Sequence, residues 1–81
     1  MKTVLERLIE YSLPGGMQDW EIPMIQAAIE DLRKKGWTDD EIVSKLKWLE
    51  HVNPEVEEDV ALRCMKRVDE QVAARLAAGA Q

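Results

Sequence analysis

Hydrophobic residues recur every three or four positions over much of the chain, which is the spacing of one face of an α-helix. The pattern first predicts a helix over residues 4–12, opened by a capping box in which Thr3 precedes Glu6 by three positions. Pro14 and the two glycines after it disfavour helical backbone. We therefore expect this helix to be followed by a loop over residues 13–19.

The second predicted helix covers residues 21–35. Pro23 falls in its first turn, where a missing amide hydrogen costs least, and Gly36 supplies the stop. Its apolar stripe consists of Ile22, Ile25, Ile29 and Leu32. Met24 falls on the opposite side, so we expect its side chain to be exposed.

The third predicted helix covers residues 39–50 and has the strongest local start signal in the sequence. Thr38 and Glu41 form a second capping box, and Trp37 occupies the first position of a hydrophobic staple. Trp48 lies about 130° from the centre of the apolar stripe, which consists of Ile42, Leu46 and Leu49. We expect Trp48 to lie at an edge of the core or in the open.

The fourth predicted helix covers residues 54–78, with Asn53 as its N-cap and Pro54 as its first residue. It would be about 36 Å long, well beyond the other three. Between Val56 and Met65 it is apolar on most of its circumference, and its far end extends beyond what the third helix can shield. We therefore expect self-association, most simply a homodimer, through Met65, Val68, Val72 and Leu76.

These four helices account for most of a short chain. At 81 residues, a single domain buries only about 60% of the surface that its unfolded chain exposes. Apolar residues make up 46% and charged residues 33%, which is the composition of a globular protein. The sequence predicts one all-α domain over residues 1–81, with three short helices and a long C-terminal helix.

Three observations bear on where the protein resides. No stretch approaches the ~18 apolar residues that cross a membrane. Glu6, Arg7 and Glu10 interrupt the apolar core that a signal peptide needs. Cys64 is the one cysteine, so no internal disulfide can form, which fits a reducing compartment. We expect a water-soluble, cytoplasmic protein with no membrane contact.

The charge balance bears on the choice of partner. Lys and Arg number 11 and Asp and Glu 16, giving a net charge of −5, which disfavours nonspecific attraction to nucleic acid or anionic lipid. Acidic residues concentrate where the fourth predicted helix begins, at Glu55, Glu57, Glu58 and Asp59. Two explanations stay open: the helix dipole favours negative charge at a helix start, or these residues form a docking surface for a basic partner.

The residues that carry catalysis or bind metals are few. His51 is the one histidine and falls near the end of the third predicted helix, where its partial charge suits the dipole. Cys64 lies in an apolar stripe, as a buried inert thiol does. No paired acid, base and nucleophile and no spaced set of metal ligands is present. We predict a protein that is not an enzyme and uses no cofactor or metal.

The segment from Gly36 to Ile42 is similar to the opening half of a helix-turn-helix, a generic DNA-binding motif that would cover about half the chain and identifies no family. A DNA-binding transcriptional regulator is the alternative function. Its phosphate contacts would come from Lys45, Lys47, Arg63, Lys66 and Arg67. Against it, the chain from Leu46 to Val56 is longer than the tight turn of that motif, and the next helix opens with carboxylates that repel phosphate.

The tryptophans favour a protein partner instead. Tryptophan is enriched at binding hot spots because it combines a large apolar area with one polar group. Trp48, off the core stripe, is the best anchor, with Trp20 and Met24 as further contact residues. We predict a small non-catalytic protein-protein interaction module that acts as a regulator, inhibitor or accessory subunit, with the acidic residues of 55–59 steering a basic partner.

Overall fold

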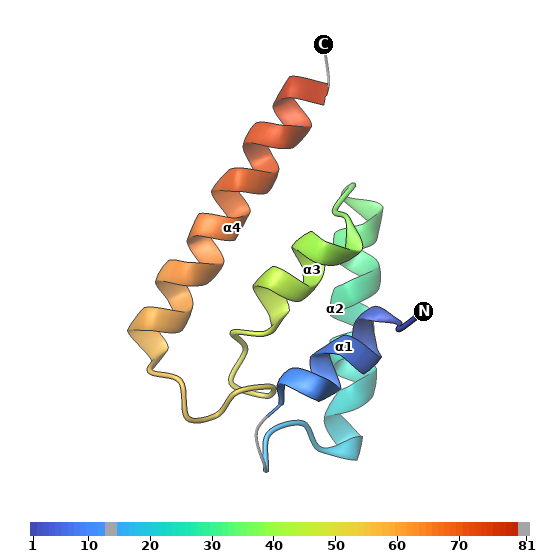
Figure 1. Cartoon of the computed structure of the whole chain (residues 1–81), viewed down its shortest axis with the longest axis vertical. Coiled ribbons are helices and arrows are strands. Elements are labelled where there is room, and N and C mark those ends of the chain that lie inside the picture. The colour runs from blue at the N-terminus through green and yellow to red at the C-terminus, as the bar shows by residue number, and fades with distance from the viewer. Residues whose placement is uncertain (13–14, 80–81) are drawn as a thin grey trace.

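The computed structural model describes residues 1–12 and 15–79, and it confirms the all-α fold class. Directly before the second helix lies a short 3-10 helix, η1 (Asp19–Glu21). In the described residues, the α-helices are α1 (Val4–Tyr11), α2 (Ile22–Lys34), α3 (Asp39–Leu46) and α4 (Glu58–Gly79) (Figure 1). The predicted bounds of α1 and α2 are within one residue of these. Leu13 and Pro14, where the predicted loop begins, lie outside the described residues.

α3 lies at the centre of the arrangement. α1 and α2 pack against one side of it and against each other, whereas α4 packs along the opposite side (Figure 1). The C-terminal end of α4 projects past the other helices, and the molecule measures 44 × 29 × 20 Å. Although α4 is long, none of the helices in the described ranges is apolar enough to cross a bilayer.

The core forms where α1, α2 and α3 meet. The predicted stripes of α2 and α3 supply most of its side chains, which are Val4, Leu8, Ile25, Ile29, Leu32, Ile42, Val43, Leu46 and Val52. Burying one such aliphatic side chain contributes about 1.5–3 kcal/mol. Helices as short as α1 and α3 are marginal in isolation, so this shared core is what keeps them folded.

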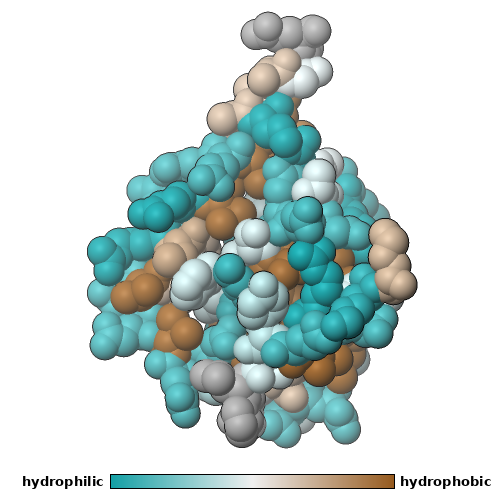
Figure 2. Space-filling model, viewed as in Figure 1, coloured by the Kyte–Doolittle hydropathy of each residue, from teal (hydrophilic) through white to brown (hydrophobic). Residues whose placement is uncertain are grey.

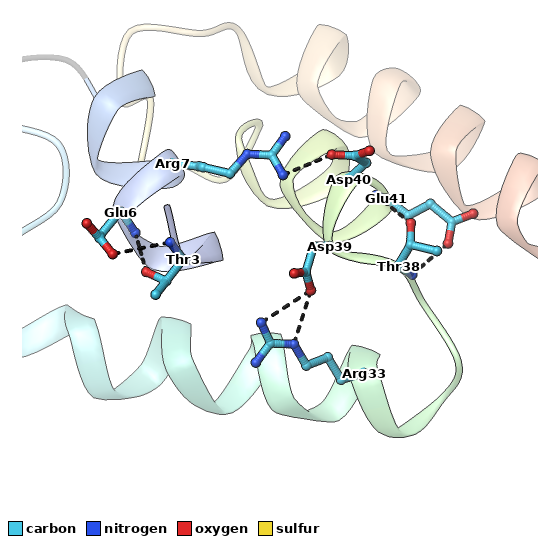
Figure 3. A network of polar contacts seen from close by, with 8 residues as sticks. All are labelled: Thr3, Glu6, Arg7, Arg33, Thr38, Asp39, Asp40 and Glu41. Atoms are coloured by element: carbon cyan, nitrogen blue, oxygen red, sulfur yellow. Dashed lines mark hydrogen bonds and ion pairs between the residues drawn. The ribbon is translucent and has the colours of Figure 1, made fainter. Parts of the chain in front are cut away.

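Both predicted capping boxes are confirmed (Figure 3). At the start of α1, Thr3 Oγ1 accepts from the Glu6 amide at 3.1 Å, and Glu6 Oε1 accepts from the Thr3 amide at 3.2 Å. At the start of α3, the Glu41 amide donates to Thr38 Oγ1 at 3.2 Å, and Glu41 Oε1 accepts from the Thr38 amide at 2.8 Å. Each box satisfies two amide hydrogens that a helix start would otherwise leave unpaired.

The predicted end of the third helix at residue 50 is wrong, because α3 ends at Leu46. The amides of Trp48 and Leu49 donate to carbonyls three residues back, at 3.2 and 3.0 Å, rather than four. Bonds of this kind tighten the last turn of a helix and end it. The chain thereby turns early enough for Val52 to reach the core.

The predicted start of the fourth helix at Pro54 is also wrong, because α4 begins at Glu58. Asn53 is not its N-cap: the Asn53 side-chain amide donates backwards, to the carbonyl of Lys47. Pro54 lies in a turn. The first α-helical bond runs from the amide of Ala61 to the Glu57 carbonyl at 3.0 Å.

Although the last turn of α4 is exposed, the predicted self-association residue Val72 is covered by the chain itself. Val72 is 1% exposed. Arg75 Nη2 donates to the carbonyl of Gly36 at 2.8 Å, and Leu76 Cδ2 lies 3.1 Å from the point that a Cβ at Gly36 would occupy. The turn between α2 and α3 therefore covers this part of α4, and Val72 is not available to a second copy.

Candidate functional site

Residues 47–57, which join α3 to α4, are irregular in backbone but fixed in place; we call them the α3–α4 segment. Val52 is 0% exposed and belongs to the core. The Asn53 side chain holds the Lys47 carbonyl, and the Asn53 amide donates to the Leu49 carbonyl at 2.8 Å. These bonds give the segment a defined shape without a helix.

A buried carboxylate attaches the same segment to η1. Glu21 is 6% exposed, accepts from the Gln18 amide at 3.2 Å, and has its Oε1 2.8 Å from Nδ1 of His51. Burial alone would raise the pKa of Glu21, but the Gln18 amide and His51 lower it below its ordinary value. Trp20 meets the His51 ring edge-on, with centroids 6.4 Å apart. His51 thus holds the segment in place and does not lie at the end of α3.

The α3–α4 segment and the first turns of α4 enclose an apolar hollow of about 360 Å³, which we call the Trp48 hollow. Its lining consists of Trp48, Leu49, Glu50, Pro54, Val56, Glu58, Ala61, Leu62 and Met65. Leu62 is 58% exposed, so part of this apolar lining faces solvent. On the face drawn in Figure 2, hydrophobic surface follows the line of α4, with hydrophilic surface along its outer side.

The charge around the Trp48 hollow is negative. Glu50 and Glu58 belong to its lining, and the stretch from residue 50 to residue 59 contains no Lys or Arg. One cation lies beside Trp48: the Lys47 ammonium is 5.5 Å from the centroid of the Trp48 ring and 5.6 Å from that of Tyr11. Lys47 therefore lies between two aromatic rings, at a distance typical of cation–π contacts.

The structure brings together some of the predicted contact residues and separates others. Trp48, Glu58 and Met65 line one hollow. Trp48 is half-buried, as predicted for an edge position, and the remaining predicted acidic residues are exposed. Trp20 and Met24 are 67% and 57% exposed and lie on η1 and α2, outside this lining.

Six lining residues were not among the predicted contact residues, namely Leu49, Glu50, Pro54, Val56, Ala61 and Leu62. Pro54 was assigned to a helix because the start of α4 was placed too early. Leu49 was assigned to the core stripe, and it does pack against the core while also lining the hollow. Leu62 was detectable, because it points away from both apolar faces of its helix.

A second hollow, also of about 360 Å³, lies farther along α4. We call it the Trp37 hollow; its lining consists of Leu32, Lys35, Trp37, Lys45, Asp69, Val72, Ala73 and Leu76. Lys45 Nζ lies 2.7 Å from Asp69 Oδ1, joining α3 to α4, and 5.3 Å from the Trp37 ring centroid. Two of the four predicted self-association residues, Val72 and Leu76, therefore line this hollow.

Arg75 clips the C-terminal half of α4 to the start of α3. Its Nε and Nη2 donate to the two carboxylate oxygens of Glu41, each at 2.6 Å, while Nη2 also donates to Gly36. These bonds to Arg75, with help from the Thr38 amide, lower the pKa of Glu41 to about 2. In turn the Glu41 carboxylate raises the pKa of Arg75.

The residues considered for catalysis and metal binding lie apart. His51 contacts Glu21, while Cys64 is a half-buried free thiol on α4. In the part of the chain that the structure describes, no three His, Cys, Asp or Glu side chains converge in a way that could hold a metal ion.

The comparisons with known proteins add no family: no protein-family model, no curated protein and no solved structure matches this chain.

Proposed function

We propose that this protein is a small non-catalytic interaction module that binds a basic, apolar segment of another protein in the Trp48 hollow, and so acts as a regulator, inhibitor or accessory subunit. The observation that carries the proposal is a contrast between the two acidic helix starts of the molecule. The chain neutralises one of them with its own arginines and leaves the other without such partners.

The neutralised start is that of α3. Each of its three consecutive carboxylates has an arginine from a different helix (Figure 3 draws two of the three pairs). The pairs are Arg33 with Asp39 at 3.2 Å, Arg7 with Asp40 at 2.9 Å, and Arg75 with Glu41 at 2.6 Å. These carboxylates thus pair the start of α3 with each of the other three helices.

The other acidic start is that of α4. Within the described residues, no Lys or Arg nitrogen lies within 4.0 Å of a carboxylate oxygen of Glu55, Glu57 or Glu58, and Asp59 has only Arg63 on its own helix, at 3.8 Å. A helix dipole would favour one or two such charges. A whole run without partners, next to an exposed apolar hollow, fits a surface that attracts a basic partner.

In this proposal the apolar hollow provides most of the binding affinity, and the acidic residues speed the approach of a basic partner. Binding energy at protein interfaces concentrates in a few buried aromatic and aliphatic anchors, and rim charges mainly change the rate of association. Trp48 offers such an anchor, and its half-buried position leaves part of the ring to be covered by a partner.

A protein partner is favoured over duplex DNA by the state of the basic residues that DNA binding would use. Three of the five have partners: Lys45 pairs with Asp69, Lys47 lies near two aromatic rings, and Arg63 lies near Asp59. The other two, Lys66 and Arg67, are exposed on α4, the helix that begins with the acidic residues. A DNA-binding face needs cations free to displace counterions, so we expect no binding to duplex DNA even at low salt. We place the protein in the cytoplasm, in keeping with its single cysteine.

The test uses Trp48→Ala together with Ile9→Ala, which removes an exposed apolar side chain on α1, away from the hollow. Immobilised wild-type protein and both variants are used to capture binders from an array of synthetic peptides. We expect wild type and Ile9→Ala to retain peptides rich in Arg and Leu, and Trp48→Ala to lose them at least tenfold in affinity, with unchanged helicity by circular dichroism. Equal capture by all three proteins would remove Trp48 from the site and contradict the proposal.

A further inference from the structure

Each of the two hollows takes four of its lining residues from α4, and the two sets of four have the same spacing along the helix. The Trp48 hollow takes Glu58, Ala61, Leu62 and Met65 from α4. The Trp37 hollow takes Asp69, Val72, Ala73 and Leu76. Each residue of the second set follows its counterpart by eleven positions, and each set begins with a carboxylate and continues with three apolar residues.

Eleven residues are close to three full turns of an α-helix, so the two hollows open on the same side of α4. Along the axis they are separated by about 16 Å, at 1.5 Å per residue. The ion pair of Lys45 with Asp69, which joins α3 to α4, belongs to the lining of the Trp37 hollow. The result is a row of two hollows, of which the second has a polar side next to its apolar residues.

A second helix lying alongside α4 has the same rise and periodicity. Its residues at positions i and i+11 lie on one face and are about 16 Å apart, so one side chain could enter each hollow. An extended strand covers the same distance in about five residues, and its successive side chains point to opposite faces. Residues about five positions apart on a strand therefore face opposite ways and could not both enter the hollows.

The charge of the first hollow fixes the direction of such a helix. The Trp48 hollow contains Glu50 and Glu58 and no Lys or Arg. The lysines of the Trp37 hollow are already paired within the chain, Lys35 with Asp31 at 2.9 Å and Lys45 with Asp69 at 2.7 Å. A basic end is thus favoured at the first hollow.

We propose that the Trp48 and Trp37 hollows together receive one amphipathic helix of a partner protein, with apolar anchors eleven residues apart and its basic end beside Trp48. This rests on the proposed function of the Trp48 hollow and extends it to a helix-in-groove mode of recognition. The second anchor adds affinity because, once the first anchor is bound, the second is held close to its hollow at a high effective concentration.

The test uses three fluorescein-labelled helical peptides of about 18 residues, long enough to span both hollows. The first has two Leu anchors eleven positions apart, Arg at the end of the first anchor and Glu at the end of the second. The second has Ser in place of the second Leu, and the third has the Arg and Glu ends exchanged. Fluorescence anisotropy measures their binding to the whole chain, and we expect the first peptide to bind at least tenfold more tightly than either of the others.

Two variants of exposed alanines on α4 locate the second anchor. Ala73 lines the Trp37 hollow, whereas its neighbour Ala74 is exposed and lines neither hollow. We expect Ala73→Arg to bind the two-anchor peptide no more tightly than the one-anchor peptide, and to bind the one-anchor peptide as wild type does. Ala74→Arg should bind both peptides with the affinities of wild type.

The outcomes separate the two proposals. If the one-anchor peptide binds and the second anchor adds nothing, or if Ala73→Arg and Ala74→Arg behave alike, the two-hollow inference is wrong while the proposed function stands. If none of the peptides binds, both are wrong. Tighter binding of the peptide with exchanged ends would overturn the assigned direction.

Discussion

At the scale of single residues, the most informative side chain is Glu41, which does two things at once. Its carboxylate completes the capping box at the start of α3 and also accepts both hydrogen bonds from Arg75 of α4. Glutamine can replace glutamate in the first of these tasks but not in the second. The charge of Glu41 can therefore be tested apart from its capping.

We predict that this charge makes stability depend on pH. Glu41 has a pKa of about 2 in the folded chain against an ordinary value of 4.5. Above pH 4.5 the carboxylate is ionised in both states and its contribution is complete; as pH falls from 4.5 towards 2, the unfolded chain binds the proton first and the contribution is lost. Urea unfolding followed over this range should show a smaller loss for Glu41→Gln than for wild type.

The control for this prediction is Glu30→Gln, which removes an exposed carboxylate on α2. This variant should follow the pH dependence of wild type. If Glu41→Gln loses as much stability as wild type between pH 4.5 and pH 2, the Arg75 clip does not hold in solution.

The hydrophobic pattern of the sequence predicted that Trp48 lies at an edge of the core, but it did not predict the hollow that Trp48 lines. The prediction that Trp48 lies off the core stripe rested on helical geometry, whereas α3 ends at Leu46 and the half-buried position of Trp48 is set by the α3–α4 segment. The pairing of Arg75 with Glu41 joins residues 34 positions apart, and no local pattern encodes such a distance. The same holds for Glu21 and His51, which meet across 30 positions.

At the scale of elements, helix starts with capping boxes were predictable and the α3–α4 segment was not. Thr38 with Glu41 fixed one boundary, since a cap depends on residues within one turn. Asn53 and Pro54 carry an equally good local signal for a helix start. Tertiary structure overrides it, because Val52 enters the core and Asn53 is used to fold the segment back on Lys47.

We predict that Val52 and Val56, two valines of this segment, have separable roles. Val52 is fully buried, so Val52→Ala should lower the free energy of unfolding by roughly 2 kcal/mol through lost burial and a cavity. Val56 is half-buried in the Trp48 hollow, so Val56→Ala should cost about 1 kcal/mol or less and weaken binding of the basic peptide. Urea unfolding and anisotropy measure the two effects, and equal unfolding losses would show that the segment is not anchored by Val52.

At the scale of the whole molecule, the C-terminal helix is long as expected, but less of its apolar surface is exposed than the sequence suggested. The turn around Gly36 covers Val72 and packs on Leu76, so part of the apolar surface that suggested a second copy is internal. Met65 and Val68 are half-buried, and Leu62 is the large apolar residue of α4 that stays 58% exposed. Self-association therefore stays a prediction that depends on the flank of α4 around Leu62.

We predict a homodimer that forms with increasing concentration and depends on this flank. Light scattering should show the mass rising from one chain to two, and Leu62→Lys should keep the protein at one chain, because burying an unpaired ammonium opposes association. Lys66→Glu, on the same helix and exposed, serves as the control for a change of charge alone. A wild-type mass of one chain at the highest concentration would contradict the dimer and leave Leu62 to the partner helix.

The α3–α4 segment has a consequence for how such a protein could diversify. One wall of the Trp48 hollow is built from an irregular stretch whose hold on the molecule depends on Val52, Asn53 and His51, while its lining residues Pro54 and Val56 belong to no helix. Pro54 and Val56 line the hollow without belonging to the buried core, whereas Leu49 both lines it and packs against that core. If the hollow binds a partner as proposed, substitutions at Pro54 and Val56 would change its binding preference while the anchors of the segment stay in place.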